Sequence, residues 1–290
     1  MTDGAGLLAA SEIAAYRRDG YVVVRGLLGA RSVEACRQAL SDLAADRVAK
    51  TETRIWLEAG FKIKEIPPES REFYVRKYMD YVEDSPALKA AAMNRRLHLV
   101  LDQLLGRDRV LFQEMALVKP PRIGSDKPWH QDASYFRLTD PSLIAGVWIA
   151  LDSATKNNGC MEVIAGSHHG GPRPHVHEND LTRCAMPDDT VSRGDARALE
   201  MEPGNALVFH ALLHHFTGPN RSNGHRRAIQ FHYHQAGAVW GSLEDHRRLY
   251  HHEDGSYAGC TTLHGDAAAT AAYTYRGPLT REIVPMDEPA

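Results

Sequence analysis

The second half of the chain consists of short apolar runs that are separated by turn residues. The runs are rich in Val, Ile, Phe, Trp and Tyr and cover residues 109–119, 144–151, 160–164, 206–213 and 226–234. Clusters of Pro, Gly and Asn lie between them, such as Pro120-Pro121 and Asn157-Asn158-Gly159. Several short strands punctuated in this way are typical of a β-sandwich or a double-sheet jelly roll. We therefore predict a mostly β fold.

The N-terminal part of the chain shows helical spacing instead. Helices are predicted at residues 11–19, 31–45 and 85–105, with Gly20 and Gly106 ending the first and the last of them. Residues 21–24 predict a strand, and the mixed, charged residues 47–75 predict a mobile excursion.

The chain has neither an internal repeat nor a low-complexity linker, so we predict one domain over residues 1–290. Its expected parts are a helical N-terminal part (1–105), a jelly-roll core (106–236) and a C-terminal extension (237–290).

Composition argues against several classes of partner. The net charge of -3 lacks the excess of positive charge that is typical of proteins that bind nucleic acid or an anionic membrane. The longest apolar run, residues 143–151, is too short to cross a bilayer, and residues 1–20 lack the features of a secretory signal. The four cysteines form no CxxC pair, so a disulfide framework is not expected. We predict a cytoplasmic monomer or small homo-oligomer that acts on a small molecule.

The tripeptide His130-Gln131-Asp132 is the sharpest chemical signal in the sequence. In an extended segment, residues two apart project to the same face, so His130 and Asp132 can reach one metal ion together. Two histidines and one carboxylate on one face of an octahedral iron leave the three positions open that a bidentate oxoacid and dioxygen require. The chain contains 16 histidines, so this motif alone is weak evidence for a metal site. The motifs that accompany it decide the assignment.

Further short motifs accompany the tripeptide in a fixed order. They are Leu111-Phe112-Gln113, Lys119-Pro120-Pro121, Tyr135-Phe136, Val147-Trp148, Asn157-Asn158-Gly159-Cys160, Gly166-Ser167-His168, the HxxGxN of residues 215–220, and Arg226-Arg227-Ala228-Ile229. In this order and spacing, residues 21–234 resemble the phytanoyl-CoA dioxygenase family of iron(II)/2-oxoglutarate oxygenases. The resemblance implies a double-stranded β-helix core, a jelly roll of the cupin-like kind, with flanking α-helices.

The resemblance also implies roles for individual residues. His130, Asp132 and His215 match the family's iron(II) ligands. Arg226 matches the arginine that binds the distal carboxylate of 2-oxoglutarate, which suits a guanidinium because it binds carboxylates bidentately and stays charged in a pocket. The other implied co-substrate or pocket positions are Thr217, Met115, Trp148 and Lys77. The chain departs from the family at Phe216, where a small residue is usual, and at Glu114, an apparent insertion.

Two neighbouring histidines compete with His215 for the role of ligand. In a continued strand, His210 and His214 both point to the face opposite His215. The spacing to Gly218, Asn220 and Arg226 selects His215. We therefore expect His210 and His214 to have packing or supporting roles.

Strand alternation in residues 226–234 separates two faces. Arg226, Ala228, Gln230, His232 and His234 share one of them, and Arg227, Ile229, Phe231 and Tyr233 share the other. We expect the first, more polar set to face the cavity and Arg227 to lie outside the site.

The resemblance implies hydroxylation of an unactivated C–H bond in a small organic substrate, acyl-CoA-like or a secondary metabolite. Dioxygen would be consumed, and 2-oxoglutarate would be decarboxylated to succinate. Related halogenases replace the carboxylate ligand with a small residue, so Asp132 favours hydroxylation, desaturation or ring closure. Three alternatives stay open: an oxoglutarate-independent cupin-type metalloenzyme, a catalytic zinc hydrolase, and a non-catalytic binding protein on the same fold.

Overall fold

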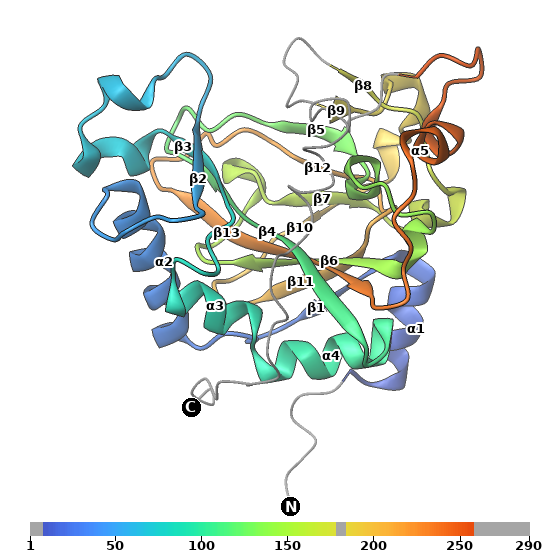
Figure 1. Cartoon of the computed structure of the whole chain (residues 1–290), viewed down its shortest axis with the longest axis horizontal. Coiled ribbons are helices and arrows are strands. Elements are labelled where there is room, and N and C mark those ends of the chain that lie inside the picture. Colours follow the sequence, from blue (N-terminus) through green and yellow to red (C-terminus); the bar gives the residue numbers. More distant parts are fainter. Residues whose placement is uncertain (1–7, 178–183, 258–290) are drawn as a thin grey trace, which may run out of the picture.

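Two antiparallel sheets face each other in the computed structural model, which describes residues 8–177 and 184–257 (Figure 1). In spatial order, the larger sheet contains β1 (Tyr21–Val24), β11 (Ala206–His210), β6 (Ile144–Ala150), β13 (Arg226–Gln235), β4 (Arg109–Lys119), β3 (Val75–Met79) and β2 (Arg54–Leu57). The smaller sheet contains β10 (Ala196–Leu199), β7 (Met161–Ile164), β12 (His215–Thr217) and β5 (Lys127–His130). A third sheet pairs β8 (Val176–His177) with β9 (Cys184–Ala185). The predicted mostly β jelly-roll core is confirmed.

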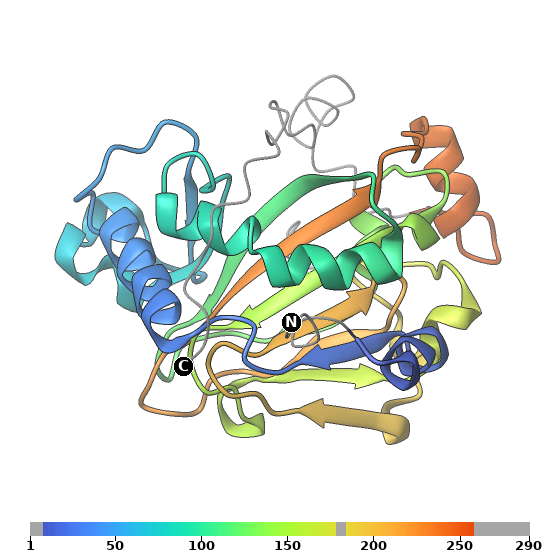
Figure 2. The same ribbon diagram turned by 90° about the horizontal axis from the view of Figure 1, so that it is seen from below.

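Helices cover the outer face of the larger sheet (Figure 2). These helices are α2 (Ala30–Ala44), α3 (Pro86–Ala92) and α4 (Arg95–Leu105). Two further helices lie elsewhere: α1 (Ala10–Asp19) contacts β1, and α5 (Leu243–Tyr250) lies near the C-terminal end of the described chain. Leu40 of α2 and Leu101 of α4 are buried in one core with Ile229 and Phe231 of β13. Burying a side chain of this size stabilises the fold by roughly 1.5–3 kcal/mol, so this face of the sheet holds the helices in place.

Strand alternation gives the larger sheet a second, inner face. Trp148, Leu207 and Ala228 point toward the smaller sheet and pack there against Met161 and Val163 of β7. The space between the two sheets therefore contains an apolar core, and side chains of both sheets also line the cavity described below.

The helices predicted at residues 11–19, 31–45 and 85–105 are confirmed, with one break. Gly20 ends α1 in the left-handed conformation, at φ 83°. The last stretch is divided into α3 and α4 at Asn94, whose side chain accepts a hydrogen bond from the backbone N–H of Leu97 and so caps the second helix.

The N-terminal part contains strands as well as helices: β1 is the strand predicted at residues 21–24, and β2 and β3 are two strands that the sequence did not predict. β1 pairs with β11, β2 pairs with β3, and β3 pairs with β4, so three N-terminal strands complete the larger sheet. The predicted excursion at residues 47–75 contains β2 itself. β2 has only four residues, and so short a strand is defined by its partners more than by its own sequence.

The described part of the chain contains no helix long and apolar enough to cross a bilayer. Cys36 and Cys160 are buried free thiols, whereas Cys184 is disulfide-bonded, so the cysteine spacing did not exclude a disulfide. Of the predicted C-terminal extension, residues 237–257 are described and include α5, and residues 258–290 lie outside the described residues.

Candidate active site

The three predicted metal ligands converge between the two sheets. His130 ends β5 and His215 begins β12, and the two are direct partners in the antiparallel register. Asp132 opens the 3-10 turn Asp132–Tyr135 that follows β5. Its Oδ1 lies 3.3 Å from His130 Nε2 and 3.5 Å from His215 Nε2, and all three side chains are buried. Two nitrogen donors and one oxygen donor therefore face one small space.

Backbone carbonyl groups orient both imidazole rings. His130 Nδ1 lies 2.8 Å from the carbonyl oxygen of Pro128, and His215 Nδ1 lies 2.9 Å from that of Leu213. A carbonyl only accepts hydrogen bonds, so each Nδ1 carries the proton and each Nε2 presents its lone pair. Burial and, to a smaller extent, the neighbouring His215 lower the pKa of His130 to about 3. The ring is therefore neutral, the form that binds metal.

Asp132 is held by two side chains of β13. Its Oδ2 accepts a hydrogen bond from Gln230 Nε2 at 3.1 Å and another from His232 Nε2 at 2.9 Å. Burial alone would raise the pKa of Asp132, but His215 and His232 keep that pKa well below its usual range. A carboxylate with one oxygen fixed and the other free completes a set of two histidines and one carboxylate, which suits non-haem iron(II).

A cavity of about 590 Å³ opens beside this triad. All the residues predicted for the co-substrate or the pocket lie on its wall: Met115, Trp148, Thr217, Arg226 and Lys77. Burial lowers the pKa of Lys77 to about 8, and its amine lies 5.7 Å from the ring centre of Trp56, another wall residue. The structure thus brings together every site residue that the sequence predicted.

A family model, Phytanoyl-CoA dioxygenase (PhyH), matches residues 16–228. The chain belongs to the phytanoyl-CoA dioxygenase family. This match confirms the predicted resemblance and the predicted dioxygenase class of enzyme.

Individual relatives agree with this assignment. The probable phytanoyl-CoA dioxygenase of Caenorhabditis elegans is 27% identical over 237 residues, which is 78% of this chain and 75% of that protein. The peroxisomal phytanoyl-CoA dioxygenase of Homo sapiens is 27% identical over 75% of this chain and 66% of its own length. The crystal structure of EctD from S. alaskensis with bound iron has a TM-score of 0.66, with 22% identity over 83% of this chain and 81% of that one. EctD has also been solved with 2-oxoglutarate and 5-hydroxyectoine.

In this phytanoyl-CoA dioxygenase family member, Arg226 is a buried cation without a counter-charge. Its Nη1 donates to the carbonyl of Leu117 at 3.2 Å, and its guanidinium lies 5.4 Å from the ring centre of Trp148. Its Nε has no hydrogen-bond partner, and no carboxylate of the described residues pairs with it. Burial lowers the pKa of Arg226 to about 10. A buried guanidinium on a cavity wall, without a paired carboxylate, is suited to bind an anionic ligand.

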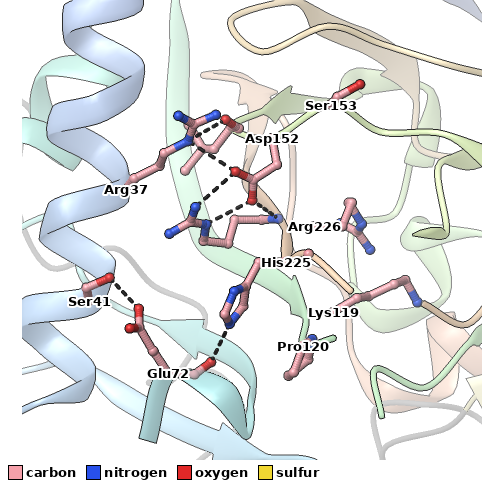
Figure 3. Close-up of polar contacts among 12 residues, drawn as sticks. Arg37, Ser41, Glu72, Lys119, Pro120, Asp152, Ser153, His225 and Arg226 are labelled. Atoms are coloured by element: carbon pink, nitrogen blue, oxygen red, sulfur yellow. Dashed lines mark hydrogen bonds and ion pairs between the residues drawn. The ribbon is translucent and has the colours of Figure 1, made fainter. Parts of the chain in front are cut away.

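Arg227, the next residue along β13, lies on the opposite face, as strand alternation predicts. Its guanidinium binds Asp152 through Nε at 2.8 Å and Nη2 at 2.9 Å, and Asp152 also pairs with Arg37 of α2 (Figure 3). The two arginines therefore have different tasks: Arg227 connects the sheet to a helix, and Arg226 faces the cavity.

Gln131, the middle residue of the tripeptide, was assigned no role from the sequence. Its Nε2 donates to the carbonyls of Gly171 and Leu212, both at 2.9 Å, and its Oε1 accepts from the N–H of Arg173 at 2.8 Å. The backbone N–H of Gln131 also donates to His175 Nε2 at 3.0 Å. Gln131 thus ties the ligand segment to the loop after β7. No pattern in a single sequence indicates such contacts between side chain and distant backbone.

The continued strand assumed for residues 210–215 does not exist, because β11 ends at His210 in the larger sheet and β12 begins at His215 in the smaller one. His214 is buried with no partner for its Nε2, and the His210 ring lies 4.9 Å from that of His168. Neither belongs to the group of residues whose ligand atoms converge.

We expect His232→Phe to weaken iron(II) binding roughly 10- to 100-fold, the usual cost of removing a group that orients a metal ligand. Phenylalanine keeps the ring between Phe112 and Phe136 but cannot donate to Asp132. Anaerobic titration with iron(II) measures the effect. The matched control is His234→Phe, because His234 bonds to the carbonyl of Gln235 and not to Asp132. Equal iron affinity in the two variants would contradict the prediction.

Proposed function

We propose that the protein is an iron(II)- and 2-oxoglutarate-dependent dioxygenase that hydroxylates an unactivated C–H bond of a small organic molecule. The co-substrate would be decarboxylated to succinate. One observation carries the proposal. The cavity beside the triad of His130, Asp132 and His215 also has on its wall a buried arginine, Arg226, that forms no ion pair with a carboxylate of residues 8–177 or 184–257.

The residues of this chain have separable tasks in the proposed reaction. His130, Asp132 and His215 would hold the iron, while Gln230 and His232 fix the orientation of the carboxylate. When bound, the iron together with dioxygen and 2-oxoglutarate supplies the oxidising chemistry, which side chains alone cannot provide.

The co-substrate would lie against β13 and β12. Arg226 would bind its distal carboxylate with two parallel N–H donors, and the hydroxyl of Thr217 would add a third hydrogen bond. Trp148 lies against the guanidinium and excludes water from it. A charged hydrogen bond is stronger in such a dry site than in water.

The remaining cavity wall is available to the primary substrate. It includes Trp56, Met79 and Phe136, and also the cationic side chain of Arg76. The relatives are named for phytanoyl-CoA or were solved with 5-hydroxyectoine, so family membership leaves the substrate unassigned. A small organic molecule, acyl-CoA-like or a secondary metabolite, is the class that we propose.

Cellular context and assembly remain proposals from composition. We place the protein in the cytoplasm as a single catalytic domain, a monomer or a small homo-oligomer, without nucleic-acid or membrane partners. Some relatives are named as peroxisomal enzymes, so the compartment needs a direct localisation measurement.

Addition of iron(II) and 2-oxoglutarate under anaerobic conditions is expected to produce a weak visible charge-transfer band, because the oxoacid would chelate the metal in the vacant positions. Admission of air with a panel of acyl-CoA and metabolite substrates should then release succinate. Omission of 2-oxoglutarate is the control. Turnover without it would favour a cupin-type metalloenzyme, and metal binding without any band or succinate would favour a binding protein.

A further inference from the structure

A second buried cation lies directly beside Arg226. Lys119 ends β4, and Arg226 and Lys119 are direct cross-strand partners in the antiparallel register. Direct partners have their Cβ atoms on the same face of the sheet, about 4.5–5.5 Å apart. Figure 3 shows both side chains projecting to the side of the sheet that faces away from α2. Both residues line the cavity.

Both cations are buried without a directly paired carboxylate among the described residues. Lys119 is 4% exposed and Arg226 is 2% exposed, and neither forms an ion pair with a carboxylate in the described part of the chain. The amine of Lys119 donates to one neutral group, the carbonyl of Ser125. Burial, and then the charge of Arg226, lower the pKa of Lys119 well below its usual range.

Such a pair is unfavourable unless something compensates for it. Like charges directly opposite each other in a sheet destabilise it, and a buried charge without a partner costs more. The structure nevertheless accommodates the lysine side chain, because the residue packed over its stem is a glycine. A Cβ added at Gly159 would lie 2.7 Å from Lys119 Cδ and 2.2 Å from the carbonyl oxygen of Gly218, so the backbone at Gly159 packs closely over the lysine stem.

We propose that Lys119 is a second binding residue for the distal carboxylate of 2-oxoglutarate, which the ammonium of Lys119 and the guanidinium of Arg226 hold between them. A carboxylate has about four acceptor sites, enough for the two donors of the arginine fork and one from the amine. The inference rests on the proposed function, since it assigns a further contact to the same co-substrate.

The position of Lys119 explains why a dicarboxylate would be preferred over a shorter oxoacid. One cation on a cavity wall attracts any carboxylate, whereas two adjacent cations require an anion at that place to offset their repulsion. An oxoacid without the distal carboxylate leaves both cations unpaired. Lys119 is therefore expected to control co-substrate selectivity more than the rate of the reaction.

The test compares 2-oxoglutarate with 2-oxobutyrate, which lacks the distal carboxylate, on the iron(II)-loaded protein. In Lys119→Met we expect the KM for 2-oxoglutarate to rise about tenfold and its preference over 2-oxobutyrate to fall about tenfold, with kcat changed less than threefold. Anaerobic thermal unfolding gives a second readout. Without oxoacid, the melting temperature of Lys119→Met should equal or exceed that of the wild type, because the repulsion is gone. The temperature increase caused by 2-oxoglutarate should be smaller.

Two further variants complete the design. Lys156→Met removes an exposed lysine three residues before Gly159. This variant should change neither the oxoacid selectivity nor the melting temperature. Lys119→Arg keeps a cation and should recover part of the selectivity.

The outcomes separate the inference from the proposed function. A Lys119→Met protein that keeps the wild-type ratio of the two oxoacids would overturn the inference alone. A variant that binds both oxoacids equally poorly and melts at a lower temperature would also overturn it, because Lys119 would then be structural. A wild-type protein that 2-oxoglutarate neither stabilises nor activates would overturn the proposed function itself.

Discussion

Alanine in place of His215 is expected to abolish iron(II) uptake and to reduce succinate formation by about a thousandfold or more, which corresponds to about 4 kcal/mol. His215 Nε2 is one of three donors that converge within 4.8 Å, and its Nδ1 is already committed to the carbonyl of Leu213. Apart from His130, no other histidine of the described residues belongs to the converging group, so no spare imidazole replaces His215 as a ligand. Metal analysis of the purified variant, together with a succinate assay, measures both effects.

His214→Ala is the matched control for this experiment. It removes another buried imidazole from the neighbouring position, and His214 Nε2 has no hydrogen-bond partner among the described residues. Iron content should stay at the wild-type level in this variant. Iron loss in His214→Ala combined with normal iron content in His215→Ala would show that the neighbouring ring is the true ligand. Circular dichroism of both variants excludes misfolding as a common cause.

Arg226→Lys is expected to weaken 2-oxoglutarate binding 10- to 100-fold while iron uptake stays unchanged. The substitution keeps a positive charge but removes the planar pair of donors that a carboxylate accepts. The loss corresponds to about 1.4–2.7 kcal/mol, since each factor of ten is worth about 1.4 kcal/mol. The apparent affinity follows from the intensity of the charge-transfer band as 2-oxoglutarate is titrated without air.

Arg227→Lys provides the control on the same strand. Arg227 points to the opposite face and binds Asp152, so its replacement should alter stability and leave the affinity for 2-oxoglutarate unchanged. If Arg226→Lys and Arg227→Lys gave the same affinity, the assignment of Arg226 to the co-substrate would be wrong.

Strand alternation explains why the sequence predicted the inner face of β13 so well. With a period of two, a single assignment of residues 226–234 as a strand separates Arg226, Gln230 and His232 from Arg227. The structure confirms this separation, since Gln230 and His232 contact Asp132 and Arg227 contacts Asp152. The tripeptide was informative for the same reason, because both potential ligands lie at the same parity.

Features that depend on pairing between distant segments could not be predicted. β5 is four residues long and includes Pro128, and β12 has three residues, so neither has a sequence pattern of its own. Each is a strand because it pairs with a partner, and the register follows from the fold. The juxtaposition of Lys119 and Arg226 is of this kind, because it follows from the antiparallel register between β4 and β13, which neither strand specifies by its own sequence.

The pairing of His130 with His215 across neighbouring strands has a consequence for the handling of the protein. The pairing of β5 with β12 brings both rings beside Asp132, and the two imidazole nitrogens and one carboxylate oxygen form a donor set that suits other divalent metals as well as iron(II). Affinities of such nitrogen and oxygen sites rise along the first-row series from manganese and iron to nickel and copper. Nickel from a purification resin would therefore occupy the site in place of iron(II), and reconstitution with iron(II) should begin with a chelator wash.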